Sequence, residues 1–216
     1  ALSLQIEDRN LELEPSLNTA DTRRSLTVKS STGLIVTPAD GYTGRLFRVD
    51  NVNEGVPRNE QHEFDEVNIE GITFSGSVTR AVSATDYDGS GKLTIKNSRF
   101  LSNGVDQGYF GGAIRSGSDL EVENSIFSGN YGQAIFAESD LSTVEVRISN
   151  SLFLDNTAQT LDYGLYNGGA VWADGDIYSV NSTYLDNDAS RGGALYSDTG
   201  DIQLVLNTFS SNFASL

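Results

Sequence analysis

Short runs in which apolar residues alternate with polar or β-branched ones recur along most of this chain, and amphipathic-helix spacing is missing from it. The clearest runs are Leu93–Ile95, Leu120–Val122, Val144–Ile148 and Ile202–Leu206. Such alternation is typical of β-strands, whose successive side chains point to opposite faces. Each run lies shortly before an Asn-Ser or Asn-Thr pair. The pattern therefore predicts an all-β chain of short strands with turns at regular places.

The turns belong to a longer repeated motif, Asn-Ser-x-Phe-x-x-Asn. Its copies begin at Asn97, Asn124, Asn150 and Asn181, and a copy one residue shorter begins at Asn207. The first Asn thus recurs at intervals of 27, 26, 31 and 26 residues. A period in this range predicts a solenoid, in which similar units stack on one another.

A third strand follows each motif and starts in a sequence close to Gly-Gly-Ala-aliphatic. Three short strands per unit of about 26 residues make one coil of a parallel β-helix. Stacked coils place equivalent residues in columns, so the motif's aromatic residues are expected to stack inside the solenoid. These residues are Phe100, Phe127, Phe153, Tyr184 and Phe209. The Asn residues are expected at the bends, because Asn tolerates left-handed backbone and its amide can bond to the next coil.

The repeat is regular over residues 67–216 and weaker before them. Phe74 lies 26 residues before Phe100, which places residues 67–76 in the same kind of coil. Residues 1–66 are expected to form N-terminal coils or a cap, with a long polar loop at 53–66. Within them, the apolar residues of 2–13 fit either a first coil or a capping hairpin. One continuous domain is predicted.

The charge of the chain bears on its partners. The formal net charge is −16, and residues 117–216 hold 14 Asp and Glu against Arg147 and Arg191. Such a surface repels phosphate backbones and anionic lipid headgroups, which disfavours nucleic acid as a partner. The sequence also has no apolar run of the length needed for a membrane span. Cysteine is absent, so thiolate metal sites are excluded.

A row of acidic residues is the candidate metal site. Four residues precede the strand that leads to the Asn turn, and two lie close by: Asp119, Asp140, Asp176 and Asp201, then Asp174 and Asp198. Stacked carboxylates repel one another unless they are hydrogen-bonded or bridged by a cation, which makes calcium one reading. The other reading is that each Asp caps its own turn. The segment 86–91 contains part of a calcium-loop pattern, but a plain Gly-rich turn fits it better.

Catalytic residues are not indicated by the sequence. A polysaccharide lyase would need a Lys or Arg base, and after Lys96 only Arg115, Arg147 and Arg191 are available. A glycoside hydrolase would need two facing carboxylates, which arise by chance in so acidic a chain. His62 is the single histidine and lies in the polar loop.

Two interleaved tetrapeptides give a family resemblance. Phe-x-x-Asn occurs at 100–103, 127–130, 153–156 and 209–212, with Tyr at 184–187; Gly-Gly-Ala-Ile occurs at 111–114, with variants at 132–135, 168–171 and 192–195. With these repeats, residues 67–216 resemble the polymorphic outer membrane protein family. The resemblance implies a right-handed parallel β-helix that is secreted or exposed on a bacterial surface, often as a passenger and often in adhesion.

The sequence thus predicts a non-catalytic β-helix, extracellular or associated with the outer membrane, that acts as an adhesin, passenger or ligand-binding scaffold. The expected partner is a glycan or protein on a host or neighbouring cell, bound by the unequal loops between the motifs. Self-association through open β-helix ends is a further possibility, because an uncovered coil is a template for another strand. One alternative is therefore a subunit that stacks head to tail into filaments. A second alternative is a lyase or hydrolase of acidic glycans.

Overall fold

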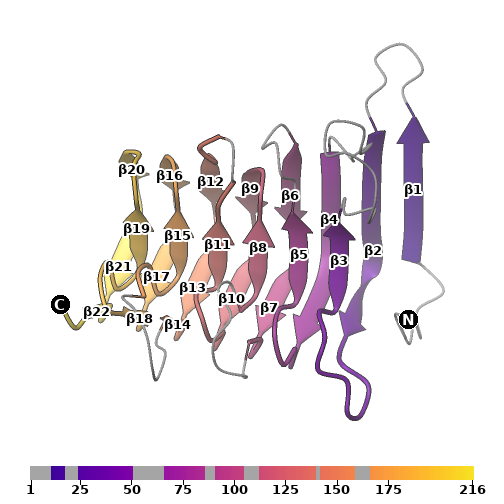
Figure 1. The fold of residues 1–216 in the computed structure, drawn as a ribbon, viewed down its shortest axis with the longest axis horizontal. Coiled ribbons are helices and arrows are strands. Elements are labelled where there is room, and N and C mark those ends of the chain that lie inside the picture. The colour runs from indigo at the N-terminus through magenta and orange to yellow at the C-terminus, as the bar shows by residue number, and fades with distance from the viewer. Residues whose placement is uncertain are drawn as a thin grey trace, which may run out of the picture.

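The chain forms one elongated solenoid of β-strands (Figure 1). The structure is a computed structural model that describes residues 11–17, 24–50, 66–85, 91–104, 112–139, 142–158 and 166–216. Within these residues every regular element is a strand. Coils follow one another along the long axis from the N-terminal end to the C-terminal end. The predicted all-β, parallel solenoid fold is confirmed.

Equivalent strands of successive coils lie beside one another and form the faces of the solenoid. The first face holds β6 (Lys92–Lys96), β9 (Asp119–Glu123), β12 (Val146–Ser149), β16 (Ile177–Val180) and β20 (Ile202–Val205). The second face holds β7 (Arg99–Leu101), β10 (Ile126–Ser128), β13 (Leu152–Leu154), β17 (Thr183–Leu185) and β21 (Thr208–Ser210). The third face holds β3 (Phe47–Asp50), β5 (Val82–Thr85), β8 (Ile114–Ser116), β11 (Ile135–Ala137), β15 (Val171–Ala173) and β19 (Leu195–Ser197).

All three faces are parallel sheets. The third face is a six-stranded sheet, and the first and second faces join through β4 (Glu66–Ser75), which pairs with both β6 and β7. Short strands β14 (Thr157–Ala158), β18 (Asp188–Ala189) and β22 (Phe213–Ala214) form a further small sheet after the second face. Pairing between coils satisfies backbone groups that a single coil would leave open.

The core is one side chain deep and is centred on a column of aromatic rings. Adjacent rings of Phe74, Phe100, Phe127, Phe153, Tyr184 and Phe209 are stacked, with centroids 4.7 to 5.2 Å apart. The predicted aromatic stack is therefore confirmed. The first five rings are buried, and the last is exposed at the C-terminal end.

The bend after the second face is built on a ladder of Asn side chains, all of them buried except the partly buried last one. These are Asn103, Asn130, Asn156, Asn187 and Asn212. Each amide nitrogen donates to a backbone carbonyl of the preceding coil, and each except that of Asn212 also donates to the Asn oxygen of the next coil, over 2.8 to 3.0 Å. The left-handed residue of this bend is the one before the Asn, such as Ser102 or Asp155. Of the two reasons expected for Asn at the bends, only hydrogen bonding between coils applies to this bend.

The bend before the second face uses the first Asn of the motif in the left-handed conformation. Asn97, Asn124, Asn150 and Asn181 have φ between 49° and 52°. In the last coil the expected alignment is wrong by one residue, because Leu206 occupies this position with a φ of 56°. Asn207 instead takes the place of Ser182, whose backbone N–H it accepts over 2.8 Å.

The N-terminal part differs from the regular coils. The strand β1 (Leu11–Leu17) pairs antiparallel with β2 (Arg24–Val36), and β2 pairs parallel with β4. β2 shifts register between Lys29 and Leu34, so it spans the bend between the first two faces. The strand β3 pairs with β5 on the third face.

Candidate functional site

The outward side of the third face carries a column of aromatic and cationic side chains. Strand register places Arg115 beside Phe136, Phe136 beside Trp172, and Trp172 beside Tyr196. We call these four residues the outer aromatic column. Their neighbours on each strand point inward, such as the fully buried Ile135 and Val171. The column therefore runs along the solenoid axis on the outside of the sheet.

Stacking and charge hold the column together. The rings of Phe136 and Trp172 are stacked with centroids 4.4 Å apart and an interplanar angle of 11°. The guanidinium of Arg115 lies 5.7 Å from the centre of the Phe136 ring, and one of its terminal nitrogens is 3.6 Å from a carboxylate oxygen of Glu138. Trp172, Tyr196 and Arg115 are half-buried, whereas Phe136 is buried, with 5% of its surface exposed. Outward positions of an exposed sheet are expected to be polar, so the half-exposed aromatic side chains of Trp172 and Tyr196 are unusual for a surface.

The sequence interpretation overlooked this column, although a signal for it exists. The residue after each Gly-Gly-Ala-aliphatic sequence is Arg115, Phe136, Trp172 or Tyr196. Because side chains alternate along a strand, a residue next to a buried aliphatic one must point outward. Three aromatic residues at one outward position could therefore have been recognised from the repeat.

The predicted acidic row lies at the corner between the third face and the first face of the next coil. Strand register aligns Asp119, Glu145, Asp176 and Asp201, with Lys92 before them. The place expected for Asp140 is thus held by Glu145, because the corner of that coil is longer; Asp140 itself lies outside the described residues. Asp174 and Asp198 follow β15 and β19 in the same corner.

The carboxylates of this corner accept backbone N–H groups from neighbouring coils. Asp119 accepts from Glu145 over 2.9 Å, and Asp176 accepts from Asp201 over 2.8 Å. Asp174 accepts from Ser139 over 3.1 Å and from Val144 over 2.7 Å. These bonds join successive coils, whereas the sequence suggested caps within one turn. They give these carboxylate oxygens hydrogen-bond partners without a cation.

For Asp176 these hydrogen bonds change the pKa of the carboxyl group. The Asp201 N–H, followed by the Tyr178 hydroxyl at 2.9 Å, lowers the pKa of Asp176. The same contact with Asp176 raises the pKa of Tyr178. Arg147 lies 4.5 Å over the Tyr178 ring and pairs with Glu145. Together they form a surface network across β12 and β16.

Metal binding by the acidic row stays a prediction. Across the described residues, no three acidic or histidine side chains are grouped so that they could hold one metal ion. Melting the protein with and without a chelator tests calcium directly, and an unchanged midpoint would contradict the calcium reading.

The arginines considered for catalysis lie apart from one another. Arg115 belongs to the third face and Arg147 to the first face. Arg191 lies in a turn, where its backbone forms an isolated β-bridge with Asn167. His62 and the segment 86–90 lie outside the described residues. The described structure therefore brings none of these arginines together in one site.

These features define a class of protein: a parallel β-helix solenoid with an internal aromatic stack, an amide ladder and a decorated outer face. Comparison with protein families matches residues 32–209 to the right-handed β-helix region. The chain belongs to this family, which confirms the predicted handedness. No curated protein and no solved structure matched the chain. Among the described residues, no helix has the length and apolarity to cross a bilayer.

Proposed function

We propose that the protein is a non-catalytic scaffold, extracellular or on the cell surface, that binds a glycan or protein ligand along its third face. The observation that carries this proposal is the outer aromatic column. Aromatic edges and a cation beside a carboxylate offer apolar contact and hydrogen bonds at the same place. Such mixed chemistry suits ligands that are partly apolar and partly polar, as sugars and protein surfaces are.

The shape of the column favours an extended ligand. Its members lie on the successive strands β8, β11, β15 and β19, so a bound chain would lie along several coils. The net charge of −16 favours neutral or cationic ligands over polyphosphates. The resemblance to polymorphic outer membrane protein repeats supports a surface location and a role in adhesion.

A glycan array and a panel of cell-surface proteins test the proposal with three forms of the chain. The wild-type protein is expected to bind, and Trp172→Ala is expected to weaken binding at least about tenfold, as loss of a central aromatic anchor does. Tyr178→Ala is the matched control, because Tyr178 also lies outside the solenoid beside an arginine, but on the first face.

Two outcomes would contradict the proposal. Binding that Trp172→Ala leaves unchanged would place the ligand elsewhere. Release of reducing ends from acidic polysaccharides by the purified protein would support the lyase or hydrolase alternative. Thermal melts of both variants establish that a lost signal is not caused by unfolding.

A further inference from the structure

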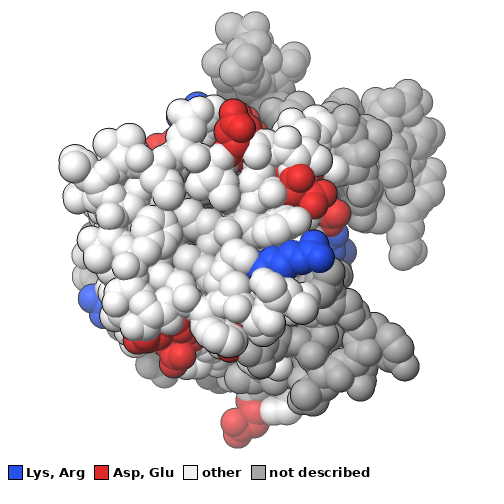
Figure 2. Space-filling view, turned by 90° about the vertical axis from the view of Figure 1, so that its left-hand side faces the viewer, with Lys and Arg blue, Asp and Glu red and all other residues white. Residues whose placement is uncertain are grey.

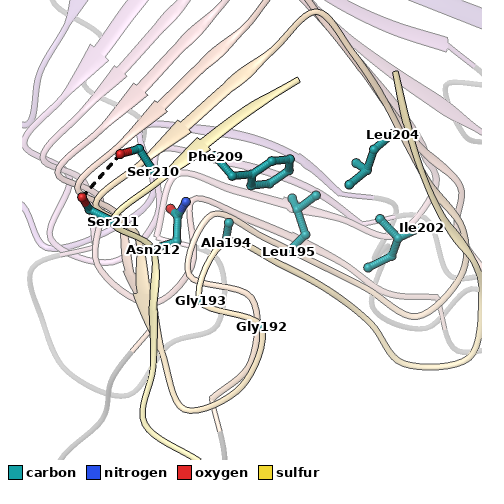
Figure 3. Close-up of a pocket in the computed structure, with 10 residues that line it drawn as sticks. All are labelled: Gly192, Gly193, Ala194, Leu195, Ile202, Leu204, Phe209, Ser210, Ser211 and Asn212. Atoms are coloured by element: carbon teal, nitrogen blue, oxygen red, sulfur yellow. Dashed lines mark hydrogen bonds between the residues drawn. The ribbon is translucent and has the colours of Figure 1, made fainter. Parts of the chain in front are cut away.

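The outward side of the third face repeats an aromatic, a small and an acidic residue in three successive coils. The three sequences are Phe136-Ala137-Glu138, Trp172-Ala173-Asp174 and Tyr196-Ser197-Asp198. Ala137 and Ala173 are fully buried, so the residues on either side of them point outward. In the last sequence, Tyr196 follows Leu195, whose side chain points into the solenoid toward that of Phe209 (Figure 3). Each coil thus presents an aromatic ring and a carboxylate on the same side.

The first of these pairs holds an arginine of the chain itself. The Arg115 guanidinium lies 5.7 Å from the centre of the Phe136 ring, and a terminal nitrogen lies 3.6 Å from a Glu138 carboxylate oxygen. Arg115 comes from the coil before Phe136. A planar guanidinium can lie over a ring and pair with a carboxylate at the same time.

The first face repeats the arrangement at a different place. Arg147 lies 4.5 Å over the Tyr178 ring, pairs with Glu145, and again comes from the coil before the aromatic residue. The chain's own arginines therefore show which chemical group an outward ring beside a carboxylate holds in this solenoid.

Trp172 has one ring face covered and one without a stacking partner. Phe136 stacks on Trp172 with centroids 4.4 Å apart. Arg115 and Trp172 lie on the strands before and after Phe136, so the cation and the indole are on opposite sides of its ring. Tyr196 is the neighbour of Trp172 on the other side, but no ring contact joins the two. Among the described side chains, no ring or cation stacks on this second face of Trp172.

Carboxylates lie beside this ring face. The N–H of Asp198 donates to the Ala173 carbonyl over 2.9 Å, which places Asp198 next to Asp174. Asp198 is exposed, and no described group pairs with its side chain. Two neighbouring carboxylates favour a positive charge close to them. Acidic side chains also gather toward the rim of the solenoid in the end view (Figure 2), and the net charge of −16 attracts cations from a distance.

We propose that Trp172 stacks on the guanidinium of an arginine from a partner protein, with Asp174 and Asp198 as the opposing charges. This inference rests on the proposed function and narrows its ligand to a protein segment that carries arginine. A flat guanidinium fits over a ring within the spacing of adjacent coils, about 4.8 Å, as the Phe136 ring does on the other face. An amino sugar is also cationic, but its puckered ring is thicker than this spacing allows.

The fluorescence of Trp172 tests the proposal directly, because it is the single tryptophan of the chain. The full chain is titrated with a peptide that has arginine at every second position among glycines and serines. A second peptide has citrulline in place of arginine, which keeps the planar group and removes its charge. The arginine peptide is expected to change the fluorescence saturably, and the citrulline peptide to bind at least about tenfold more weakly, as loss of charged hydrogen bonds does.

Two substitutions separate the site from the general acidity of the chain. Asp198→Asn removes one charge beside Trp172 and is expected to weaken binding of the arginine peptide about threefold, the size typical of an exposed ion pair. Asp186→Asn is the matched control, because Asp186 is exposed as well but lies at the bend after the second face. It is expected to leave binding unchanged. Thermal melts of both variants establish that they are folded.

Equal binding of the arginine and citrulline peptides would overturn the proposal, and so would equal losses in the two Asp variants. Tighter binding of a glucosamine oligomer than of the arginine peptide would assign the ring face to an amino glycan instead. If the arginine peptide leaves Trp172 unchanged while Trp172→Ala still weakens binding to the arrays, only this inference fails. If Trp172→Ala leaves array binding intact, the proposed function itself fails.

Discussion

The side chain of Asn156 makes four hydrogen bonds although it is fully buried. Its oxygen accepts from the N–H and the amide nitrogen of Asn130, at 3.2 and 2.9 Å. Its nitrogen donates to the Phe127 carbonyl at 3.0 Å and to the Asn187 oxygen at 2.9 Å. A carboxamide alone among side chains of this size supplies two acceptor and two donor sites in one plane. This is why the motif ends in Asn in each coil.

Asn156→Asp is expected to destabilise the protein by about 3 kcal/mol or more at neutral pH. The substitution keeps the shape of the side chain but replaces its NH2 group with an oxygen. This oxygen faces the Phe127 carbonyl and the Asn187 oxygen, to which it cannot donate. Buried polar groups without partners cost about 1 to 3 kcal/mol each. Urea unfolding measures the effect. The same change at Asn181, whose side-chain amide donates an exposed hydrogen bond to the Asn150 oxygen, is expected to cost less than about 1 kcal/mol. Equal losses at both positions would contradict the role of the buried ladder.

Leu206 is the residue in the least suitable conformation. It holds a φ of 56° at a position where the four preceding coils have Asn. A left-handed conformation costs a residue such as Leu about 1 to 2 kcal/mol, because Cβ crowds the following carbonyl oxygen, and costs Asn less.

Leu206→Asn is therefore expected to stabilise the protein by about 1 kcal/mol, and Asn181→Leu to destabilise it by a similar amount. Leu206 is 82% exposed, so few apolar contacts are lost in the first variant. Thermal unfolding of the two reciprocal variants measures both changes. A destabilising Leu206→Asn would show that the leucine side chain contributes more than its backbone costs.

For single residues, the sequence predicted which residue types stand at the bends better than it predicted the register of each motif. The Asn of the first bend could be predicted to be left-handed, because few other residues tolerate it. The last motif was misaligned, since matching Asn207 to Asn181 leaves the motif one residue short and ignores the pairing of its aromatic residues. Phe209 pairs with Tyr184, which leaves Leu206 at the bend.

Among the elements, β16 and β17 share a polar contact inside the core, which the turn between β20 and β21 extends. The hydroxyl of Tyr184 is buried and lies 2.7 Å from the Ser179 hydroxyl. Burial raises the pKa of Tyr184, so the phenol stays neutral. Ser179 occupies the register of Ile148 and Leu204, which are apolar, and bonds to the Asn207 oxygen at 3.0 Å. The coil with Tyr in the aromatic column thus also has the one small polar residue that can reach its hydroxyl.

A double-mutant cycle on Ser179 and Tyr184 tests this coupling. Ser179→Val alone is expected to cost about 2 kcal/mol, because it leaves the phenol hydroxyl buried without a partner. Adding Tyr184→Phe removes that hydroxyl and is expected to restore at least about 1 kcal/mol of the free energy of unfolding, which is the size of coupling seen between contacting residues. Urea unfolding of the four proteins provides the values. Additive losses would mean that the two residues act independently.

The strands themselves could be predicted because each coil repeats the same alternation. The corners between the third and first faces could not be aligned, since their lengths differ: the corner of Gly117 and Ser118 is short, whereas that of residues 138–145 is long. Counting back from the Asn turn would have placed Glu145, and not Asp140, beside Asp119. The antiparallel pairing of β1 also leaves no periodic signal, because it occurs once.

The whole molecule is a stack in which each coil contacts only its neighbours. Its stability is therefore a sum of coil and interface contributions, and the end coils have one interface where the inner coils have two. The repeat allowed the solenoid to be predicted as a whole, because its period gives the length of chain in one coil and strand pairing then stacks the coils. It gave no information about the outer aromatic column as a site, since a ligand leaves no trace in the register of the strands.

Hydrogen exchange should therefore vary along the axis in a defined way. In this chain, the amides of Leu206, Ser211 and Asn212 are expected to exchange fast, because no described residue accepts a hydrogen bond from them. The counterparts Asn181 and Asp186, which donate to Val205 and Ser210, are expected to exchange more slowly and serve as the internal reference. Equal exchange of these two sets of amides would contradict the hydrogen-bond pattern of the stacked coils.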